Sequence, residues 1–231
     1  MSKTIIVTGA SRGIGYEIAL NLAKQKHTVA AVARSQKELK TLQKEHPDFI
    51  DFVAADLTHQ NEIEKLTQYV SEKYSGIDIL LNNAGALVNK PFSELSRNDW
   101  QFMLDINLLS VVNLTRAVIP LLNENSHIVN ISSMGGFQGS GKFPGLTSYS
   151  VAKGAVSILS ECLAAELTQQ NISVNALCLG SVQTEMFETA FPNFKADVSP
   201  QKMGTYIADF ALNGSTFYNG RILPVALSDP S

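Results

Sequence analysis

The residues most suited to chemistry are a tyrosine and a lysine, Tyr149 and Lys153, in the segment TSYSVAKGAVSIL (147–159). In a helix, residues at this spacing lie on one face, so the two side chains can meet. A free phenol has a pKa of about 10 and is a weak acid at neutral pH. A neighbouring ammonium lowers that pKa, which would let the phenol exchange a proton with a carbonyl oxygen. A YxxxK pair is also ordinary helix surface, so the other motifs must decide.

A glycine-rich segment forms the second candidate site. In TIIVTGASRGIG (4–15), Gly9, Gly13 and Gly15 lie between an expected strand and an expected helix. Glycine permits a tight turn and lets a pyrophosphate approach the backbone, while the helix N-terminus offers unpaired N–H groups. The spacing is TGxxxGxG rather than GxGxxG, and a turn that merely packs helix against strand is the alternative. The strand before and the helix after favour a dinucleotide site.

The end of the second expected strand indicates which dinucleotide binds. Folds that bind NAD usually carry an acid about 20 residues after the glycine loop, for the ribose 2′-hydroxyl. HTVAAVARSQ (27–36) has Arg34 and Ser35 at that place, and Arg12 lies inside the glycine loop. Two guanidinium groups near one point suit a 2′-phosphate. The sequence therefore predicts NADP(H) rather than NAD(H), unless Arg34 is only a solvated charge at a helix start.

Asp56 ends the third expected strand in FVAADLT (52–58), where it and Leu57 are candidates for contact with the adenine. Asp is also a favoured cap for a following helix. Because Thr58 could cap that helix instead, we favour the site role for Asp56.

Short β-rich runs alternate with helical patterns along the chain. Strands are expected at 3–8, 27–33, 49–55, 77–83, 127–132, 172–179 and 221–225. The first helix is expected to end at 24, and further helices are expected at 35–46, 58–74, 98–122, 149–169 and 201–212, with a short helical segment after 184. Alternation of this kind predicts parallel βαβ units with right-handed crossovers. We expect one α/β domain over residues 1–231, a Rossmann-like doubly wound parallel sheet of about seven strands with helices on both faces.

Composition excludes several classes of protein. The net charge is −3 and no cluster of Lys and Arg appears, which argues against nucleic-acid binding. Cys162 and Cys178 form neither CxxC nor zinc spacing, so both are expected to be small core residues and no metal site is expected. The N-terminus lacks the long apolar segment of a signal peptide, and no apolar run is expected to be long enough to span a bilayer. We expect a soluble cytoplasmic protein with no membrane partner.

Seven motifs, in order along about the whole chain, resemble the short-chain dehydrogenase/reductase family in its single-domain branch. They are TGASRGIG (8–15), Asp56, NNAG (82–85), Asn107, ISS (131–133), YSVAK (149–153) and GSVQT (180–184). The resemblance implies that Tyr149 is the general acid and base. It also implies that Lys153 holds the nicotinamide ribose and lowers the pKa of Tyr149, and that Ser133 polarises the substrate carbonyl.

Two further residues have independent support. A hydroxyl at the carboxyl edge of a parallel sheet lies where ligands bind, and strand alternation points Ser132 and Ser133 in opposite directions. Asn107 interrupts an apolar stripe at helical spacing formed by Trp100, Leu104, Val111, Leu114 and Val118. A buried amide must find partners. The resemblance implies that Asn107 holds a water of a proton relay, and a purely structural amide is the alternative.

The resemblance also extends the expected cofactor site. Asn83, Ala84 and Gly85 would line the cofactor, unless they only form a turn after the fourth strand. Thr184 and the backbone of Val182 would meet the nicotinamide carboxamide, although Thr184 also precedes EMFETA as a possible helix cap. The full expected set comprises Gly9, Ser11, Arg12, Gly13, Ile14, Gly15, Arg34, Ser35, Asp56, Leu57, Asn83, Ala84, Gly85, Tyr149, Lys153, Gly180, Val182 and Thr184.

The chain departs from the family in three places. Leu179-Gly180 replaces the frequent Pro-Gly, which removes a restraint on φ. The stretch between Ser133 and Tyr149 is a few residues longer than usual, and Phe137 and Phe143 in it could reach a substrate. The part after Thr184 is short, so Met186, Phe187 and Phe191 would line a small, open, apolar pocket or else form plain core.

The helix that carries Tyr149 is apolar on two sides. One stripe holds Val151, Ala155, Ile158 and Cys162, and another holds Ala152, Val156, Leu159 and Leu163. One stripe can face the sheet, whereas the other needs a cover that a second subunit could supply. Together with the family's habit of pairing these helices, this predicts a homodimer or homotetramer.

The predicted function is NADPH-dependent reduction of a carbonyl group to an alcohol, with a small ketone or dicarbonyl compound favoured as substrate. No basic cluster near the expected pocket advertises an acyl-carrier protein, so a 3-oxoacyl thioester reductase is the alternative. A catalytically silent dinucleotide sensor would usually lack one of Asn107, Ser133, Tyr149 and Lys153. An epimerase or dehydratase would need a separate substrate domain, for which 231 residues leave no room.

Overall fold

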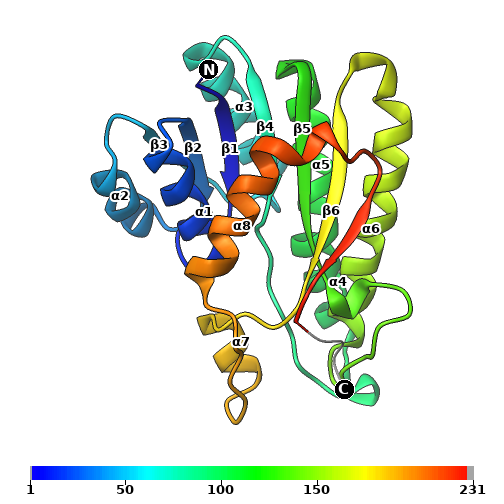
Figure 1. The fold of residues 1–231 in the computed structure, drawn as a ribbon. Coiled ribbons are helices and arrows are strands. Elements are labelled where there is room, and N and C mark those ends of the chain that lie inside the picture. The colour runs from blue at the N-terminus through cyan, green and yellow to red at the C-terminus, as the bar shows by residue number, and fades with distance from the viewer. Residues whose placement is uncertain (1, 228–231) are drawn as a thin grey trace.

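The computed structural model describes residues 2–227 and contains one seven-stranded sheet in the order β3-β2-β1-β4-β5-β6-β7 (Figure 1). Every neighbouring pair of strands is parallel. The expected fold class, a Rossmann-like doubly wound sheet, is confirmed. The strands are β1 (Thr4–Thr8), β2 (Thr28–Ala33), β3 (Ile50–Ala54), β4 (Ile77–Asn82), β5 (Leu122–Ser133), β6 (Ser173–Leu179) and β7 (Ile222–Val225).

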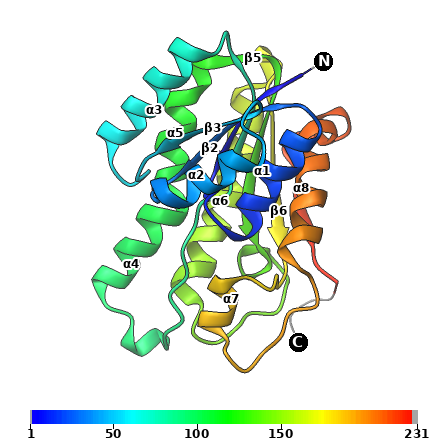
Figure 2. The same ribbon diagram turned by 90° about the vertical axis from the view of Figure 1, so that its left-hand side faces the viewer.

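Helices cover both faces of the sheet, as Figure 2 shows in side view. Helices α1 (Gly13–Lys24), α2 (Gln36–Glu45) and α8 (Pro200–Asn213) lie on one face, and α3 (Gln60–Lys73), α5 (Ser110–Val118) and α6 (Thr147–Glu166) lie on the other. Helix α4 (Arg97–Leu104) precedes α5, and the short α7 (Glu185–Ala190) lies beyond the carboxyl ends of the strands.

Alternation along the strands builds the two halves of the core. In β1, Ile5 and Val7 pack with Ile18 and Leu22 of α1, whereas Ile6 packs in the layer of α3 and α5. All of these side chains are fully buried. Short, continuously apolar strands are what a sheet covered on both faces requires.

The strand order reverses direction at β1, whose two neighbours are β2 and β4. In such sheets, the loops that leave the carboxyl ends of the strands on either side of the reversal diverge and leave a crevice where ligands bind. The glycine loop follows β1 and the NNAG segment follows β4, so the fold brings these two motifs to that point.

The single helix expected over 98–122 is wrong. Helix α4 ends at Leu104, a π-helical turn η2 (Asp105–Leu109) follows, and α5 ends at Val118 before a 3₁₀ turn η3 (Ile119–Leu121). The N–H of Ser110 donates a hydrogen bond to the carbonyl of Asp105, and the Ser110 hydroxyl donates one to the carbonyl of Ile106. Side-chain competition for helical carbonyls of this kind favours a local widening, and such turns frequently occur at functional sites.

Two smaller expectations also differ. Strand β5 begins at Leu122 rather than at 127, because Leu122 pairs with Ile77 ahead of a register shift between Ile77 and Ile79. Cys162, expected in the core, is exposed, whereas Cys178 is buried as expected. Cys162 belongs to the stripe of α6 that does not face the sheet.

The segment Arg97–Leu121 meets the length and composition of a membrane span, contrary to the expectation that no run would. In the fold this segment is the broken helix α4–η2–α5–η3, and 39% of its most apolar window is buried. Leu114 and Val118 from it belong to the core beside α3. Its apolar character is therefore used, at least in part, for packing on the sheet.

Candidate active site

One cavity of about 880 Å³ runs along the carboxyl edge of the sheet, and every residue expected in the site lines it. The cavity thus extends from Arg34 and Asp56, past the glycine loop, to Tyr149. The lining residues that the sequence singled out are Gly9, Ser11, Arg12, Gly13, Ile14, Gly15, Arg34, Ser35, Asp56, Leu57, Asn83, Ala84, Gly85, Asn107, Ser133, Tyr149, Lys153, Gly180, Val182 and Thr184.

The glycine loop has the geometry of a pyrophosphate site. Gly9 and Gly13 have φ values of 67° and 58°, in the left-handed region that favours glycine. A Cβ at Gly15 would lie 2.3 Å from the carbonyl oxygen of Gly9, so no side chain fits there. Helix α1 begins at Gly13 with no side-chain cap and no acid in its first turn. Its first N–H groups and its dipole therefore suit a bound anion.

The glycine loop is tied to the segment after β4 through Thr8. The Thr8 hydroxyl accepts hydrogen bonds from the N–H groups of Asn83 (2.9 Å) and Ala84 (3.0 Å). The side chain of Asn83 donates to the Thr8 carbonyl at 2.9 Å. Asn83 and Ala84 thus form more than a simple turn. Thr8 received no role of its own in the sequence analysis, although a hydroxyl at the last position of an apolar strand indicates a side chain that could bond to a neighbouring loop.

Arg12 does not stand free beside Arg34 as the sequence suggested. Its Nη1 lies 2.6 Å from Oε2 of Glu185, the first residue of α7. Both side chains are more than half exposed, so this ion pair contributes little stability and a phosphate could displace it. Glu185 also escaped the sequence analysis, because an acid in the first turn of a helix is usually read as a partner of the helix dipole.

The far end of the cavity holds Arg34, Ser35 and Asp56. Arg34 is exposed, and Ser35 caps α2 by accepting the N–H of Glu38. Asp56 does not cap α3, which begins after His59; its Oδ1 instead accepts the N–H and the hydroxyl of Thr58. Burial raises the pKa of Asp56, but these bonds and the charge of Arg34 outweigh it and lower the pKa. The carboxylate therefore faces the cavity in its ionised form.

Strand alternation places the two serines at the end of β5 as expected. Ser132 is buried and donates to the carbonyl of Lys153 at 2.8 Å, against α6. Ser133 faces the cavity, and its Oγ accepts the N–H of Gly135 at 3.1 Å. That bond uses the oxygen as an acceptor, so the Ser133 proton can be donated to the Tyr149 oxygen or to a ligand.

Lys153 is clamped to β5 at both ends. Its carbonyl accepts the Ser132 hydroxyl, and its Nζ donates to the carbonyl of Ile131 at 2.8 Å. The residue is 4% exposed. Burial lowers the pKa of Lys153 to about 8, with the neighbouring Cys178 acting in the opposite direction. The helix thus delivers a desolvated amine to the same cavity as Tyr149.

The pKa of Tyr149 differs from the expectation. Burial raises it above its usual value, and the neighbouring Ser133 hydroxyl opposes that shift. Lys153 does not lower the pKa of Tyr149 as expected, because its amine donates to the carbonyl of Ile131 instead. In the protein alone, the phenol is therefore held in its protonated form.

Asn107 lies at the centre of the π-helical turn and is fully buried. Its Oδ1 accepts the N–H of Ala86, and its Nδ2 donates to the carbonyls of Ala86 and Met103. These bonds hold the loop after β4, as the structural alternative predicted. A methyl group at Gly85 would lie 2.9 Å from Asn107 Oδ1 and 3.5 Å from Lys153 Nζ. The amide therefore also lies on the Lys153 side of the cavity.

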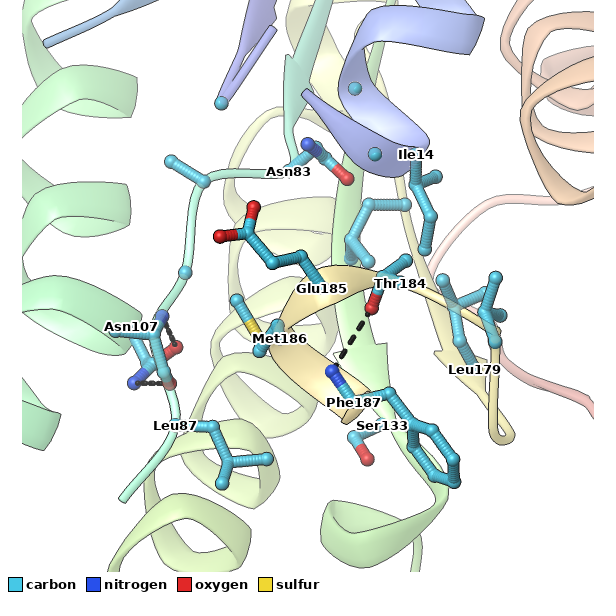
Figure 3. A pocket seen from close by; sticks show the side chains of 18 of the residues that line it. Ile14, Asn83, Leu87, Asn107, Ser133, Leu179, Thr184, Glu185, Met186 and Phe187 are labelled. Carbon is cyan, nitrogen blue, oxygen red and sulfur yellow. Dashed lines mark hydrogen bonds between the residues drawn. The ribbon is translucent and has the colours of Figure 1, made fainter. Parts of the chain in front are cut away.

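The segment after β6 also lines the cavity, as Figure 3 shows for Leu179, Thr184 and Glu185. Thr184 caps α7 by accepting the N–H of Phe187 at 3.2 Å, and it also approaches Gly13 of the glycine loop. Met186, Phe187 and Phe191 line the cavity, and no residue of α7 is buried. The pocket-lining alternative for these side chains is confirmed, and the core alternative is wrong for them.

The chain matches the family model of the short chain dehydrogenase over residues 3–194. The protein belongs to the short-chain dehydrogenase family. Members of this family are oxidoreductases that use a nicotinamide dinucleotide and interconvert alcohol and carbonyl groups, and the loop and helix terminus described above fit such a cofactor.

Several relatives of this short-chain dehydrogenase carry more specific names. A 3-oxoacyl-acyl-carrier-protein reductase of Thermotoga maritima is 35% identical over 191 residues, which cover 80% of this chain and 76% of that protein. A protein of the same name from Chlamydia trachomatis is 30% identical and covers 97% of this chain and 96% of its own length. An actinorhodin polyketide ketoreductase, solved with NADPH, superposes with a TM-score of 0.88 at 30% identity over 97% of this chain and 96% of that chain.

Proposed function

We propose that this short-chain dehydrogenase reduces a carbonyl compound to an alcohol with NADPH and that Tyr149 is its general acid. The observation that carries this proposal is the convergence of three groups at one end of the cavity. They are the phenol of Tyr149, the hydroxyl of Ser133 and the buried amine of Lys153. The glycine loop that fits a dinucleotide lies in the same cavity.

When bound, the nicotinamide cofactor supplies a hydride to the carbonyl carbon. Ser133 donates its proton to the carbonyl oxygen and orients it. Tyr149 then transfers its phenolic proton to that oxygen as negative charge develops there. Because burial raises the pKa of Tyr149, the phenol is protonated before the reaction begins.

Lys153 and Asn107 support this proton transfer. A protonated Lys153 holds cofactor ribose hydroxyls through its donors and favours the tyrosinate that the reaction leaves behind. Its lowered pKa, about 8, lets the same amine return a proton to Tyr149. Asn107 holds the loop at Gly85, beside Lys153 Nζ.

The preference for NADPH over NADH rests on Arg34. Arg34 and Ser35 follow the end of β2, at the place where an NAD-binding fold would carry an acid, and both line the cavity. Glu38 also lines this end, and we propose that Arg34 outweighs its repulsion of a 2′-phosphate. Arg12 can contribute once an anion replaces Glu185 as its partner.

The variant Arg34→Asp tests the preference. The ratio of NADPH to NADH affinity should fall by roughly 10- to 100-fold, the worth of a hydrogen bond to a charged group. Fluorescence titration of both reduced cofactors measures it. Arg97→Asp makes the same substitution outside the cavity and should leave the ratio unchanged. An unaltered ratio in Arg34→Asp would contradict the assignment.

A small ketone or dicarbonyl compound is the favoured substrate because the basic side chains near the mouth are isolated rather than clustered, with Lys195 lining the cavity next to Phe194. Lys142 donates to the carbonyls of Phe137 and Ser140, and Lys90 pairs with Asp99 at 3.0 Å. A carrier protein would need several exposed basic groups together at this rim. The names of the two relatives favour the second candidate, reduction of a 3-oxoacyl thioester on an acyl-carrier protein.

We also propose that the protein is a cytoplasmic homodimer or homotetramer. The two stripes of α6 differ as expected: Ala152 and Val156 are fully buried, whereas Val151 and Ile158 are 49% and 58% exposed. Phe102 and Leu109, on the adjoining α4 and π-helical turn, are also exposed. A second copy would cover both helices. A monomer in light scattering at micromolar concentration would contradict this.

Turnover with a panel of carbonyl compounds tests the main proposal. The purified protein is mixed with NADPH and with ketones, dicarbonyls or 3-oxoacyl thioesters, and loss of reduced cofactor is followed. Tyr149→Phe should reduce the rate by roughly 100- to 10,000-fold, the usual contribution of a general acid. Tyr206→Phe removes a hydroxyl on α8 outside the cavity and should not. Tight NADPH binding without turnover would favour a dinucleotide-sensing protein instead.

A further inference from the structure

Four phenylalanine side chains gather at the Tyr149 end of the cavity. Phe143 comes from the long loop before α6, and Phe187, Phe191 and Phe194 come from α7 and the residues after it. The ring centroids of Phe191 lie 5.9 Å from Phe143, 5.3 Å from Phe187 and 6.3 Å from Phe194. The angles between these rings are 51°, 39° and 90°, within the arrangements that aromatic pairs prefer.

The other side chains around this cluster are mostly apolar. Leu87, Met134, Leu146 and Met186 line the same cavity, and Figure 3 draws Leu87, Met186 and Phe187 in one view with Ser133. The ammonium of Lys142 is held by backbone carbonyls. This end therefore offers two hydroxyl donors, Ser133 and Tyr149, and an aromatic wall. The ammonium of Lys195, next to Phe194, also lines the cavity. Apart from that cation, the lining suits a carbonyl group attached to an apolar ring.

Backbone contacts hold the aromatic wall in place. Asn89 donates to the carbonyl of Ala190, next to Phe191, and the N–H of Lys90 donates to the carbonyl of Gly145, close to Phe143. The loop after β4 therefore fastens both segments that carry the rings. A ligand can meet rings that are already positioned, which reduces the entropy lost on binding.

The wall is also incompletely covered. Phe143 is 37% exposed and Phe194 is 70% exposed, at the mouth of a cavity. Apolar rings that stay open to a cavity commonly mark a ligand site. By contrast, rings that served only to close α7 onto the protein would be expected to bury one another.

We propose that the substrate is an aryl ketone or an aryl-substituted dicarbonyl compound, with its carbonyl at Ser133 and Tyr149 and its ring against Phe143, Phe187 and Phe191. This inference rests on the proposed carbonyl reduction and specifies the substrate class. The selectivity comes from ring-to-ring contact, so it depends on aromatic side chains and not only on apolar ones.

The test compares two vicinal diketones that differ in one substituent, 1-phenyl-1,2-propanedione and 2,3-pentanedione, with NADPH. The phenyl compound should have a kcat/KM about 10-fold higher, since ring contacts contribute beyond simple burial. Phe191→Leu and Phe143→Leu keep an apolar side chain but remove the ring, and each should lower that selectivity several-fold, mainly through KM. Phe217→Leu, at a ring that is 81% exposed and outside the cavity, should not change it.

The outcomes separate this inference from the reaction beneath it. Turnover of both diketones with equal kcat/KM would overturn the aromatic assignment and leave the reductase proposal standing. The same holds if Phe191→Leu lowers kcat/KM for both compounds equally. No turnover of any carbonyl compound would remove the reductase proposal and this inference with it.

Discussion

The contact between Gly136 and α6 offers a sharp test of how the site is positioned. Gly136 ends the 3₁₀ turn η4 (Met134–Gly136), which directly follows Ser133. A Cβ at Gly136 would lie 2.4 Å from the nitrogen of Gly154 and 2.6 Å from the carbonyl carbon of Lys153. Both are backbone atoms, so no side chain can rotate away. The close approach of η4 to α6 therefore sets the relative position of Ser133 and Lys153.

The variant Gly136→Ala should move the catalytic helix. Ordinary contact begins at 3.4 Å and the closest atom lies at 2.4 Å, so α6 must retreat by the difference, about 1 Å. A misplacement of that size can cost about 100-fold in rate, which corresponds to about 2.7 kcal/mol of activation free energy. We expect kcat to fall by about that factor while NADPH affinity changes less, because the glycine loop is not displaced.

The assay is NADPH oxidation with the best carbonyl substrate, with melting temperature measured in parallel because overpacking itself costs about 1–3 kcal/mol of stability. Gly139→Ala is the control: its φ of 85° makes alanine strained, but nothing lies within 4 Å of its Cβ. That variant should keep kcat within about threefold. A folded Gly136→Ala protein with an unaltered kcat would refute the reasoning. Equal losses in both variants would attribute the effect to backbone strain.

Three further predictions follow from buried or paired groups. Burial lowers the pKa of His127 to about 4. Between pH 6.5 and 4, the histidine of the unfolded chain, with a pKa of about 6.5, therefore binds a proton that the folded chain does not. The free energy of unfolding should fall by about 3 kcal/mol as the pH is lowered from 6.5 to 4. Urea titrations across that range should show this component lost in His127→Gln. Asn107→Leu leaves the backbone of Ala86 unpaired and should cost about 1–3 kcal/mol in urea unfolding, together with a lower kcat. Glu185→Gln removes the ion-pair partner of Arg12. The variant should bind NADPH several-fold more tightly at low salt, with a smaller effect at high salt. An unchanged affinity at low salt would contradict this prediction.

Local patterns were sufficient to predict most of the framework. Apolar runs with β-branched residues predicted the seven strands, and the spacing of Gly9, Gly13 and Gly15 predicted the turn between β1 and α1. Alternation in β5 correctly separated Ser132 from Ser133. These predictions succeed because periodicity and glycine conformation depend on neighbours in the chain. They place every expected site residue at one edge of the sheet without any knowledge of tertiary contacts.

Contacts between distant segments lay beyond such patterns. The anchoring of Asn107 depends on Ala86, 21 residues earlier, and the pairing of Arg12 depends on Glu185, 173 residues later. The raised pKa of Tyr149 depends on burial and on Lys153 turning to the carbonyl of Ile131. None of these partners has a fixed sequence spacing that could predict it.

The residue types and their order were enough to predict the fold class, the glycine loop between β1 and α1 and the presence of Tyr149 and Lys153 on one helix. Tertiary structure alone decided the charge state of the phenol, the partner of Arg12 and the meeting of Phe143 with Phe187 and Phe191. The physical reason is that desolvation, ion pairing and ring contact act through space over a few ångströms. Only folding brings the loop before α6 within a few ångströms of α7 and the residue that follows it.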